Sequence, residues 1–195
     1  MNAQRLALPL QDCRFAAIDF ESAGIQPGAS EAPVQIGIAV MQGLQFQPED
    51  SFRSYLRCDQ EITWSAAKVH GITKDDLQSA PTIMSIWPDV RKRLEGAVIV
   101  AHGAGTEKRF LRVFPTHSFG PWLDTVSLSR RCYPDAKSHR LGDLIQAMSL
   151  EEEMASECPE WKWHDALYDS IASLSLLRYL ILQMGWQEKL LSELV

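Results

Sequence analysis

The sequence predicts an α/β fold in which a mixed sheet carries helices on both faces. Two observations predict it: short apolar runs come early in the chain, and strand-like and helix-like segments alternate after them. A length of 195 residues, with 46% hydrophobic and 23% charged residues, is ordinary for one globular domain with a sizeable core. We therefore expect a single domain covering residues 1–195, without internal repeats.

The predicted strands are short and mostly apolar. We expect them at residues 15–20, 34–41, 44–46, 51–56 and 98–101. The third and fourth follow a turn at Gly43 and are predicted to be paired edge strands. The segment 21–33 is rich in Gly, Pro and Ser, which predicts a loop.

The predicted helices show helical spacing of apolar residues or begin at a capping residue. We expect them at residues 63–70, 73–78, 81–94, 107–114, 124–131, 141–149 and 165–184. Thr73 and Asp124 are predicted N-caps, and Pro115 ends the fourth helix. The last helix is the longest, with apolar residues at helical spacing from Ala166 to Ile181.

Composition excludes several classes of protein. A formal net charge of −6 argues against a broad basic face that coats duplex DNA. The four cysteines contain no CxxC pair, which argues against a disulfide framework or a zinc site. The N-terminal segment has too little positive charge and too short an apolar stretch for a signal peptide. No apolar run reaches the length of a bilayer span. We expect a cytoplasmic protein that does not contact membranes.

The first candidate site is Asp19-Phe20-Glu21, at the end of an apolar strand. Side chains two residues apart on a strand point to the same face, so Asp19 and Glu21 project together while Phe20 faces the core. Paired carboxylates suit Mg²⁺ or Mn²⁺, which prefer oxygen ligands. The same spacing recurs at Asp59 and Glu61 in a polar stretch, where a solvated turn is the simpler interpretation. This pair alone does not distinguish a metal site from a polar strand end.

The second candidate pair is His164 and Asp169, near the start of the last helix. Residues five apart are rotated by ~140° on a helix, so both cannot lie on one helical face. We therefore expect Asp165 to cap the helix, Asp169 to lie in its first turns and His164 to precede it on a loop. A histidine beside a fixed carboxylate is a suitable general base for a water molecule. His70 and Asp75 have the same separation, but there the histidine is expected to be satisfied locally, and a surface histidine remains an alternative for His164.

The third candidate is Glu107, in VIVAHGAGTEKRFL, a strand, a glycine-containing loop and a helix. An acid at a helix N-terminus is favoured by the helix dipole, so Glu107 alone does not indicate chemistry. The loop lacks the GxxxxGK[ST] pattern of a P-loop.

Taken in order, these segments resemble a known family. AIDFESAG, VQIGIA, VHGIT, VAHGAGTEKRFL, LDT and HDALYD, between about Phe15 and Leu182, resemble the DEDDh exonucleases. This DnaQ-like family includes proofreading subunits, oligoribonuclease-like enzymes, RNase T and exonuclease I. The resemblance implies an RNase H-like fold, a five-stranded mixed sheet flanked by helices, in agreement with the predicted elements.

The resemblance also implies a two-metal site for Mg²⁺ or Mn²⁺. His164 matches the general base. The matching metal ligands are Asp19, Glu21, Glu107 and Asp169. Glu107 stands where the family usually has Asp, and Gly103 where it often has Asn, so Glu107 is the departure that matters most.

The resemblance places the terminal nucleotide near two further segments. These are Ser22, Ala23 and Gly24 after the first motif, and Val69 with His70. Trp161 and Trp163 flank the His164 loop and could stack on bases or simply anchor the loop. A basic cluster could guide the strand, although solvated faces of this kind are common: Arg130, Arg131, Lys137, His139 and Arg140.

The sequence therefore predicts a 3′→5′ exonuclease that releases 5′-mononucleotides, preferably from single-stranded DNA, because the terminal nucleotide must be unpaired. Three alternatives remain open. The protein could be a proofreading-type subunit of a DNA polymerase, although no long extra tail indicates such a partner. It could be an exoribonuclease, since the sequence does not separate DNA from RNA. It could also be a nucleic-acid-binding relative with weakened catalysis, for which Glu107 is the support.

Overall fold

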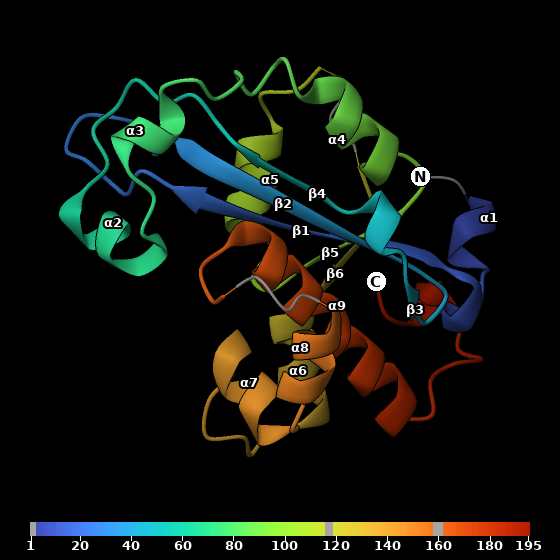
Figure 1. Ribbon diagram of the computed structural model, residues 1–195. Helices are drawn as coiled ribbons and strands as arrows, with labels where there is room; N and C mark the ends of the chain where they lie inside the picture. The colour runs from blue at the N-terminus through green and yellow to red at the C-terminus, as the bar shows by residue number, and fades with distance from the viewer. Residues whose placement is uncertain (1–2, 116–118, 158–161) are drawn as a thin grey trace.

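Strand β1 (Arg14–Ser22) lies at the centre of a mixed sheet (Figure 1). The structure, a computed structural model, describes residues 3–115, 119–157 and 162–195. β1 pairs antiparallel with β2 (Pro33–Gln42) and parallel with β5 (Val98–Ala101). β5 in turn pairs parallel with β6 (Trp122–Asp124), which was not predicted because it has only three residues and the last of them, Asp124, is the N-cap of the next helix.

The outer edge of β2 differs from the prediction. β3 (Gln45–Phe46) and β4 (Phe52–Tyr55) both pair with β2 and not with each other. A 3₁₀ turn at Pro48–Asp50 separates them, and Pro48 has no backbone N–H to give to a ladder. One edge position is therefore filled by two short strands, and the described sheet has six strands where five were expected.

Helices cover both faces of the sheet, as expected. On one face, α9 (Ala166–Gln183) packs against β1 and β2 and is itself contacted by α6 (Thr125–Cys132), α7 (Leu141–Ala147) and α8 (Glu151–Glu157). On the other face lie α4 (Trp87–Leu94) and α5 (Gly105–Leu111), whose apolar side chains join those of β1 and β2 in a second core cluster.

The alternation along β1 decides which side chains meet which helices. Phe15 and Ala17 belong to the core cluster around α9, whereas Ala16, Ile18 and Phe20 belong to the cluster around α4 and α5. The odd-numbered positions therefore face α9.

Smaller elements complete the chain. Two short helices, α2 (Trp64–His70) and α3 (Lys74–Leu77), lie beyond the carboxyl end of β1 (Figure 1). Near the termini are α1 (Ala3–Leu6) and 3₁₀ turns at Leu10–Asp12 and Leu191–Glu193, joined by an isolated bridge between Pro9 and Leu190.

The predicted helix ends agree in part with the structure. Thr73, Asp124 and Asp165 cap α3, α6 and α9 as expected. The helix predicted from residue 81 begins only at Trp87, because Ser85 bonds back to Thr82 in a local turn. α5 ends at Leu111, four residues before Pro115, and α8 was not predicted.

Two predictions from composition can be compared with the described residues. Cys13, Cys58 and Cys132 are free thiols, and Cys158 lies outside the described residues. No helix in the described part of the chain combines the length and the apolar character needed to cross a membrane.

Candidate active site

The candidate site begins at the carboxyl end of β1. Asp19 and Glu21 occupy odd-numbered positions and so share the face toward α9, while Phe20 packs edge-to-face on Phe110 in the opposite core, 5.3 Å between ring centroids. This is the division between site and core that the spacing predicted.

A glycine lets α9 start directly against this strand end. Gly37 lies opposite Asp19 in the β1–β2 register, and a Cβ at residue 37 would lie 2.1 Å from the backbone of Ala166 and Leu167. Ser170, one turn into the helix, donates to the Gly37 carbonyl at 3.0 Å. Because only a residue without a side chain permits this approach, Gly37 sets the depth at which Asp169 meets the strand carboxylates.

His164 and Asp169 have the arrangement predicted for them. The Asp165 side chain accepts the Leu167 N–H at 3.1 Å and begins α9, and His164 precedes it with a left-handed φ of 66°. Ligand atoms of Glu21, His164 and Asp169 all lie within 4.8 Å of one another. The exposed histidine therefore stands beside two carboxylates that the fold holds in place.

The carboxylates raise one another's pKa values. The pKa of Asp19 lies well above its usual range because the group is buried and faces Asp169, Glu21 and Glu107. Burial, with Asp169 and Asp165 nearby, raises the pKa of Glu21 to about 8. Burial also raises the pKa of Asp169 to about 7, against a backbone hydrogen bond from His164. The cluster thus carries like charge that a cation would relieve.

Glu107 approaches this cluster from the other face of the sheet: its charge helps to raise the pKa of Asp19, but it is not among the three described residues whose ligand atoms lie within 4.8 Å of one another. It lies in the first turn of α5, is only 6% exposed, and burial raises its pKa to about 7. Its Oε2 and the Oδ1 of Asp169 are buried and have no hydrogen-bond partner among the described residues. Hard carboxylate oxygens that lack partners are ligands suited to Mg²⁺ or Mn²⁺. The residues present therefore fit a divalent cation site.

Asp124 does more than the helix capping predicted for it. Its carboxylate accepts the N–H groups of Val126 at 2.9 Å, Gly103 at 3.1 Å and Ala104 at 3.2 Å. Gly103 has a φ of 90°, which suits a residue without a side chain. Asp124 thereby ties the loop that carries Glu107 to the start of α6.

Sequence reasoning missed a network behind His164. The Asp165 carboxylate accepts from Arg53 Nε at 2.7 Å and from Gln35 Nε2 at 3.1 Å. The Gln35 Oε1 accepts the Ala166 N–H at 2.8 Å. These bonds join β2, β4 and the start of α9. Gln35 lies in the VQIGIA segment, but the sequence does not indicate its partner, and no local pattern marks Arg53.

The segments predicted to hold the terminal nucleotide come together beside β1. His70 Nδ1 accepts the Ile72 N–H at 3.0 Å, so Nε2 carries the proton donated to the Ser22 carbonyl at 3.1 Å. Burial lowers the pKa of His70, in keeping with this neutral form. Gly24 has a φ of 84° and packs on Thr63. His70 is thus satisfied locally, as predicted, and links the two segments.

The Ala23 side chain is buried beneath this junction, whereas Val69 is 52% exposed and free to contact a ligand. Trp64, from the same helix, is 77% exposed.

The predicted strand-guiding residues divide into several groups. The Arg131 guanidinium lies 5.0 Å from the Trp186 ring centroid, and His139 Nδ1 lies 2.9 Å from Ser129 Oγ. Arg130 and Arg140 are exposed. Trp163 packs edge-to-face on Tyr168, and Trp161 lies outside the described residues.

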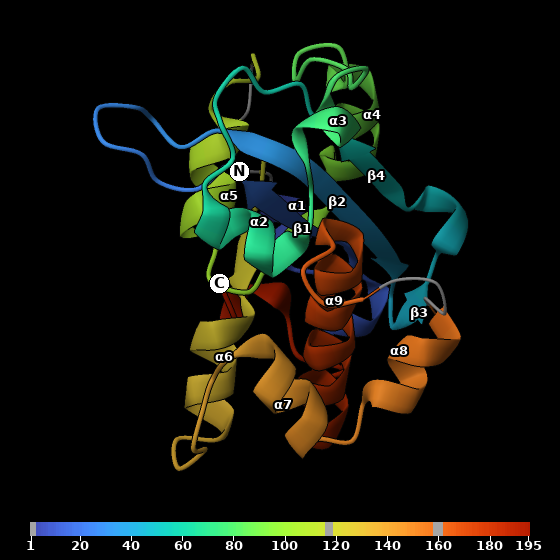
Figure 2. The same ribbon diagram turned by 60° about the vertical axis from the view of Figure 1, so that its left-hand side comes forward.

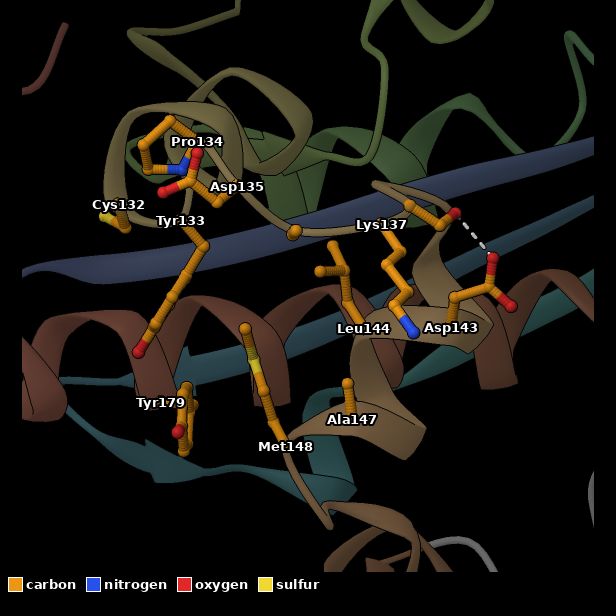
Figure 3. A pocket seen from close by; sticks show the side chains of 12 residues that line it. Cys132, Tyr133, Pro134, Asp135, Lys137, Asp143, Leu144, Ala147, Met148 and Tyr179 are labelled. Carbon is orange, nitrogen blue, oxygen red and sulfur yellow. Dashed lines mark hydrogen bonds between the residues drawn. The ribbon is translucent and has the colours of Figure 1, made fainter.

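Hollows in the surface lie on both sides of His164. One of about 350 Å³ includes His70, Arg53 and Asp165, and another of about 670 Å³ includes Asp169 and leads toward α7. A larger, mostly apolar cavity of about 800 Å³ lies between α6, α7 and α9 (Figure 3). Tyr133, Met148 and Tyr179 line it together with Lys137 of the predicted basic cluster, and none of the predicted metal-ligand, base or nucleotide-binding residues does.

Residues 16–177 match the family model RNase_T, described as exonuclease. The chain belongs to this exonuclease family. The match covers the β1 carboxylates, the Glu107 loop and the start of α9, and the predicted DEDDh assignment is confirmed. The chain therefore contains a domain of a family of nucleases, which are hydrolases.

Curated relatives are similar over most of this chain. The DNA polymerase III subunit epsilon-like protein of Rhodobacter capsulatus is 31% identical over 170 residues, 85% of this chain and 23% of that protein. A DNA polymerase III PolC-type protein of Thermotoga maritima is 28% identical over 144 residues, 71% of this chain and 10% of that protein. The 3′-5′ exonuclease DinG of Bacillus subtilis is 25% identical over 146 residues, 72% of this chain and 15% of that protein. The chain thus spans less than a quarter of the length of these relatives.

Solved structures confirm the RNase H-like fold. Exonuclease X, in complex with 5′ overhanging duplex DNA, superimposes with a TM-score of 0.71 and 25% identity over 92% of this chain and 98% of its own. The nuclease domain of 3′hExo, a DEDDh family member bound to rAMP, gives a TM-score of 0.71 at 16% identity over 91% of this chain and 95% of its own.

Proposed function

We propose that this protein is a metal-dependent 3′→5′ exonuclease that releases 5′-mononucleotides from single-stranded DNA, with residues 1–195 forming one catalytic domain in the cytoplasm. The carboxylates of Asp19, Glu21, Glu107 and Asp169 carry the proposal. Their mutual repulsion and their buried oxygens without hydrogen-bond partners would be relieved by bound cations, whereas they contribute nothing to the stability of a core. A relative named as a 3′-5′ exonuclease supports the direction of cleavage.

The chain supplies ligands and a base. Asp19, Glu21, Glu107 and Asp169 would hold two Mg²⁺ or Mn²⁺ ions, which supply an activated water and charge stabilisation at phosphorus. His164, exposed on its turn beside Asp169, accepts the proton of the attacking water. Asp165 holds that turn through Arg53 and Gln35, so the histidine approaches from a fixed direction.

Matched oligonucleotides test the proposal. The wild-type protein is mixed with single-stranded DNA labelled at either end, with Mg²⁺, Mn²⁺ or EDTA, and compared on duplex DNA and on RNA of the same sequence. We expect a 3′ label to leave first as a 5′-mononucleotide and a 5′ label to remain on a shrinking ladder. Release of the 5′ label first, or no metal-dependent release, overturns the proposal. Faster cleavage of RNA instead identifies an exoribonuclease.

The chain offers a control for the metal site. Asp19→Asn should remove nearly all turnover without lowering thermal stability, because it relieves a self-repelling cluster. Asp59→Asn has the same Asp-x-Glu spacing at an exposed position and should match the wild type. A large loss of stability in Asp19→Asn would assign that residue a structural role.

The turnover of Glu107 variants distinguishes an active enzyme from a nucleic-acid-binding relative with weakened catalysis. Its buried, unpartnered Oε2 supports a placement among the working ligands, one methylene longer than aspartate, with Gly103 giving the loop latitude. Glu107→Gln should reduce turnover at least ~10²-fold, and Glu107→Asp should remain active. Equal rates for Glu107→Gln and wild type would contradict this placement.

A further inference from the structure

The groove of about 670 Å³ on the α7 side of His164 has a second half that the candidate metal site does not use. Beside His164 and Asp169, the groove is lined by Arg140, Gln146 and Trp163. This volume lies within the range of sites that hold small organic groups. α2, beside which the terminal nucleotide is proposed to bind, and α7 lie apart from each other in both views (Figures 1 and 2).

Trp163 presents a fixed aromatic surface in this groove. Its ring lies against Gly142, where a Cβ would be 3.8–3.9 Å from three ring carbons, and Tyr168 packs edge-to-face at 5.0 Å. The indole Nε1 has no hydrogen-bond partner among the described residues. A ring that is already immobilised can stack on a base at little further cost in conformational entropy.

Arg140 provides a positive charge at the same place. Its guanidinium forms no ion pair within the described part of the chain, in contrast to Arg178, which pairs with Glu153. The backbone of Arg140 is held, since its N–H donates to Ser138 Oγ at 3.2 Å and the adjacent His139 carbonyl accepts from His102 at 2.8 Å. Asp143 and Glu151 also line the groove and repel a phosphate, so a phosphate bound there must lie against Arg140.

We propose that this groove is a subsite for the nucleotide on the 5′ side of the scissile phosphate, with Trp163 stacking on its base and Arg140 pairing with its phosphate. This subsite rests on the proposed exonuclease function and adds a substrate requirement to it. A base stacked on Trp163 cannot be paired, so the preferred substrate has at least two unpaired nucleotides at its 3′ end. Single-stranded ends are then favoured by contacts as well as by the avoided cost of melting.

Three substrates separate this subsite from the chemistry. The first is a decathymidylate, the second carries an abasic residue at the penultimate position, and the third is the p-nitrophenyl ester of thymidine 5′-monophosphate, which has no upstream nucleotide. Stacking is worth about 1–3 kcal/mol per base, so the wild type should lose about 5- to 150-fold in kcat/KM on the abasic substrate.

Variants of the two groove residues are compared on the same three substrates. Trp163→Leu should lose a similar factor on decathymidylate, lose little more on the abasic strand, and match the wild type on the nitrophenyl ester. Arg140→Gln should weaken oligonucleotide cleavage and leave the ester unchanged. Trp186→Leu and Arg112→Gln are matched controls outside the groove and should match the wild type on all three substrates.

Equal wild-type rates on the intact and abasic strands overturn the subsite. So does a Trp163→Leu variant that loses the same factor on the nitrophenyl ester, because that pattern shows a purely structural role. If the wild type cleaves none of the three substrates, the proposed function fails. The subsite is then tested by measuring oligonucleotide affinity instead of cleavage. The His164→Ala variant with Ca²⁺ should then bind the abasic strand about tenfold more weakly, and Trp163→Leu should abolish the difference. Equal affinities overturn the subsite there as well.

Discussion

Removing the charge of Glu21 should stabilise the metal-free protein at alkaline pH. The pKa of Glu21 rises from 4.5 to about 8 in the folded chain, so folding favours its protonated form. The free energy of unfolding therefore falls as pH rises from about 4.5 to about 8 and stays low above that. The variant Glu21→Gln lacks this loss and should gain relative to the wild type across the same window.

The size of the effect follows from the pKa difference. Each tenfold change in acid strength corresponds to about 1.4 kcal/mol, which sets an upper bound of about 5 kcal/mol. Because solvent reaches the partly buried carboxylate, we expect about 2–3 kcal/mol. For a chain of this length that is a rise of roughly 5–10 °C in melting temperature at pH 8.5, and little change near pH 5.

The assay is thermal unfolding in EDTA at pH 5 and pH 8.5. Burial lowers the pKa of His70 and His102, so these histidines make the free energy of unfolding fall as pH falls. Glu21 has the opposite effect on the free energy of unfolding. The difference between variant and wild type cancels the contribution of the histidines. Glu49→Gln, at an exposed position, should show no pH-dependent difference. The reasoning is refuted if Glu21→Gln is no more stable than the wild type at pH 8.5, or equally more stable at both pH values.

The remaining predictions test how the site is assembled. Gly37→Ala should lower stability by several kcal/mol and reduce kcat, since its Cβ would overlap the first turn of α9, while Gly105→Ala, with open space around it, should be tolerated in melts and in turnover. Asp124→Asn should lower turnover roughly tenfold with the melting temperature reduced only slightly, because one of three backbone N–H partners is lost; unchanged kinetics would contradict its role in holding the Glu107 loop. His164→Ala should lower kcat by roughly 10²–10⁴-fold and change the shape of the pH profile, with substrate affinity less affected, and a profile identical to the wild type would place the base elsewhere.

Local pattern was sufficient for the elements that carry most of the site. The alternation along β1 determined that Asp19 and Glu21 share a face, because strand geometry alone controls that placement. The offset of five between His164 and Asp169 determined that one lies on a turn and the other on a helix. The caps at Thr73, Asp124 and Asp165 were predictable because each accepts a backbone N–H two or three residues along the chain.

Elements defined by distant partners were not predictable in this way. β6 has only three residues and exists as a strand because β5 lies beside it. β3 and β4 were assigned to each other because they are neighbours in sequence, whereas both are held by β2. A short strand has little intrinsic preference, so its partner decides where it pairs.

The sequence by itself thus determined the strand carboxylates, the histidine turn and the family to which the chain belongs. Only the tertiary structure decided that Gly37 admits α9, that Arg53 and Gln35 hold Asp165, and that Asp124 fastens the Glu107 loop. These contacts join residues from about 20 to 130 positions apart. No local pattern marks such pairs, because a side chain gains its partner only when the sheet brings separate segments together.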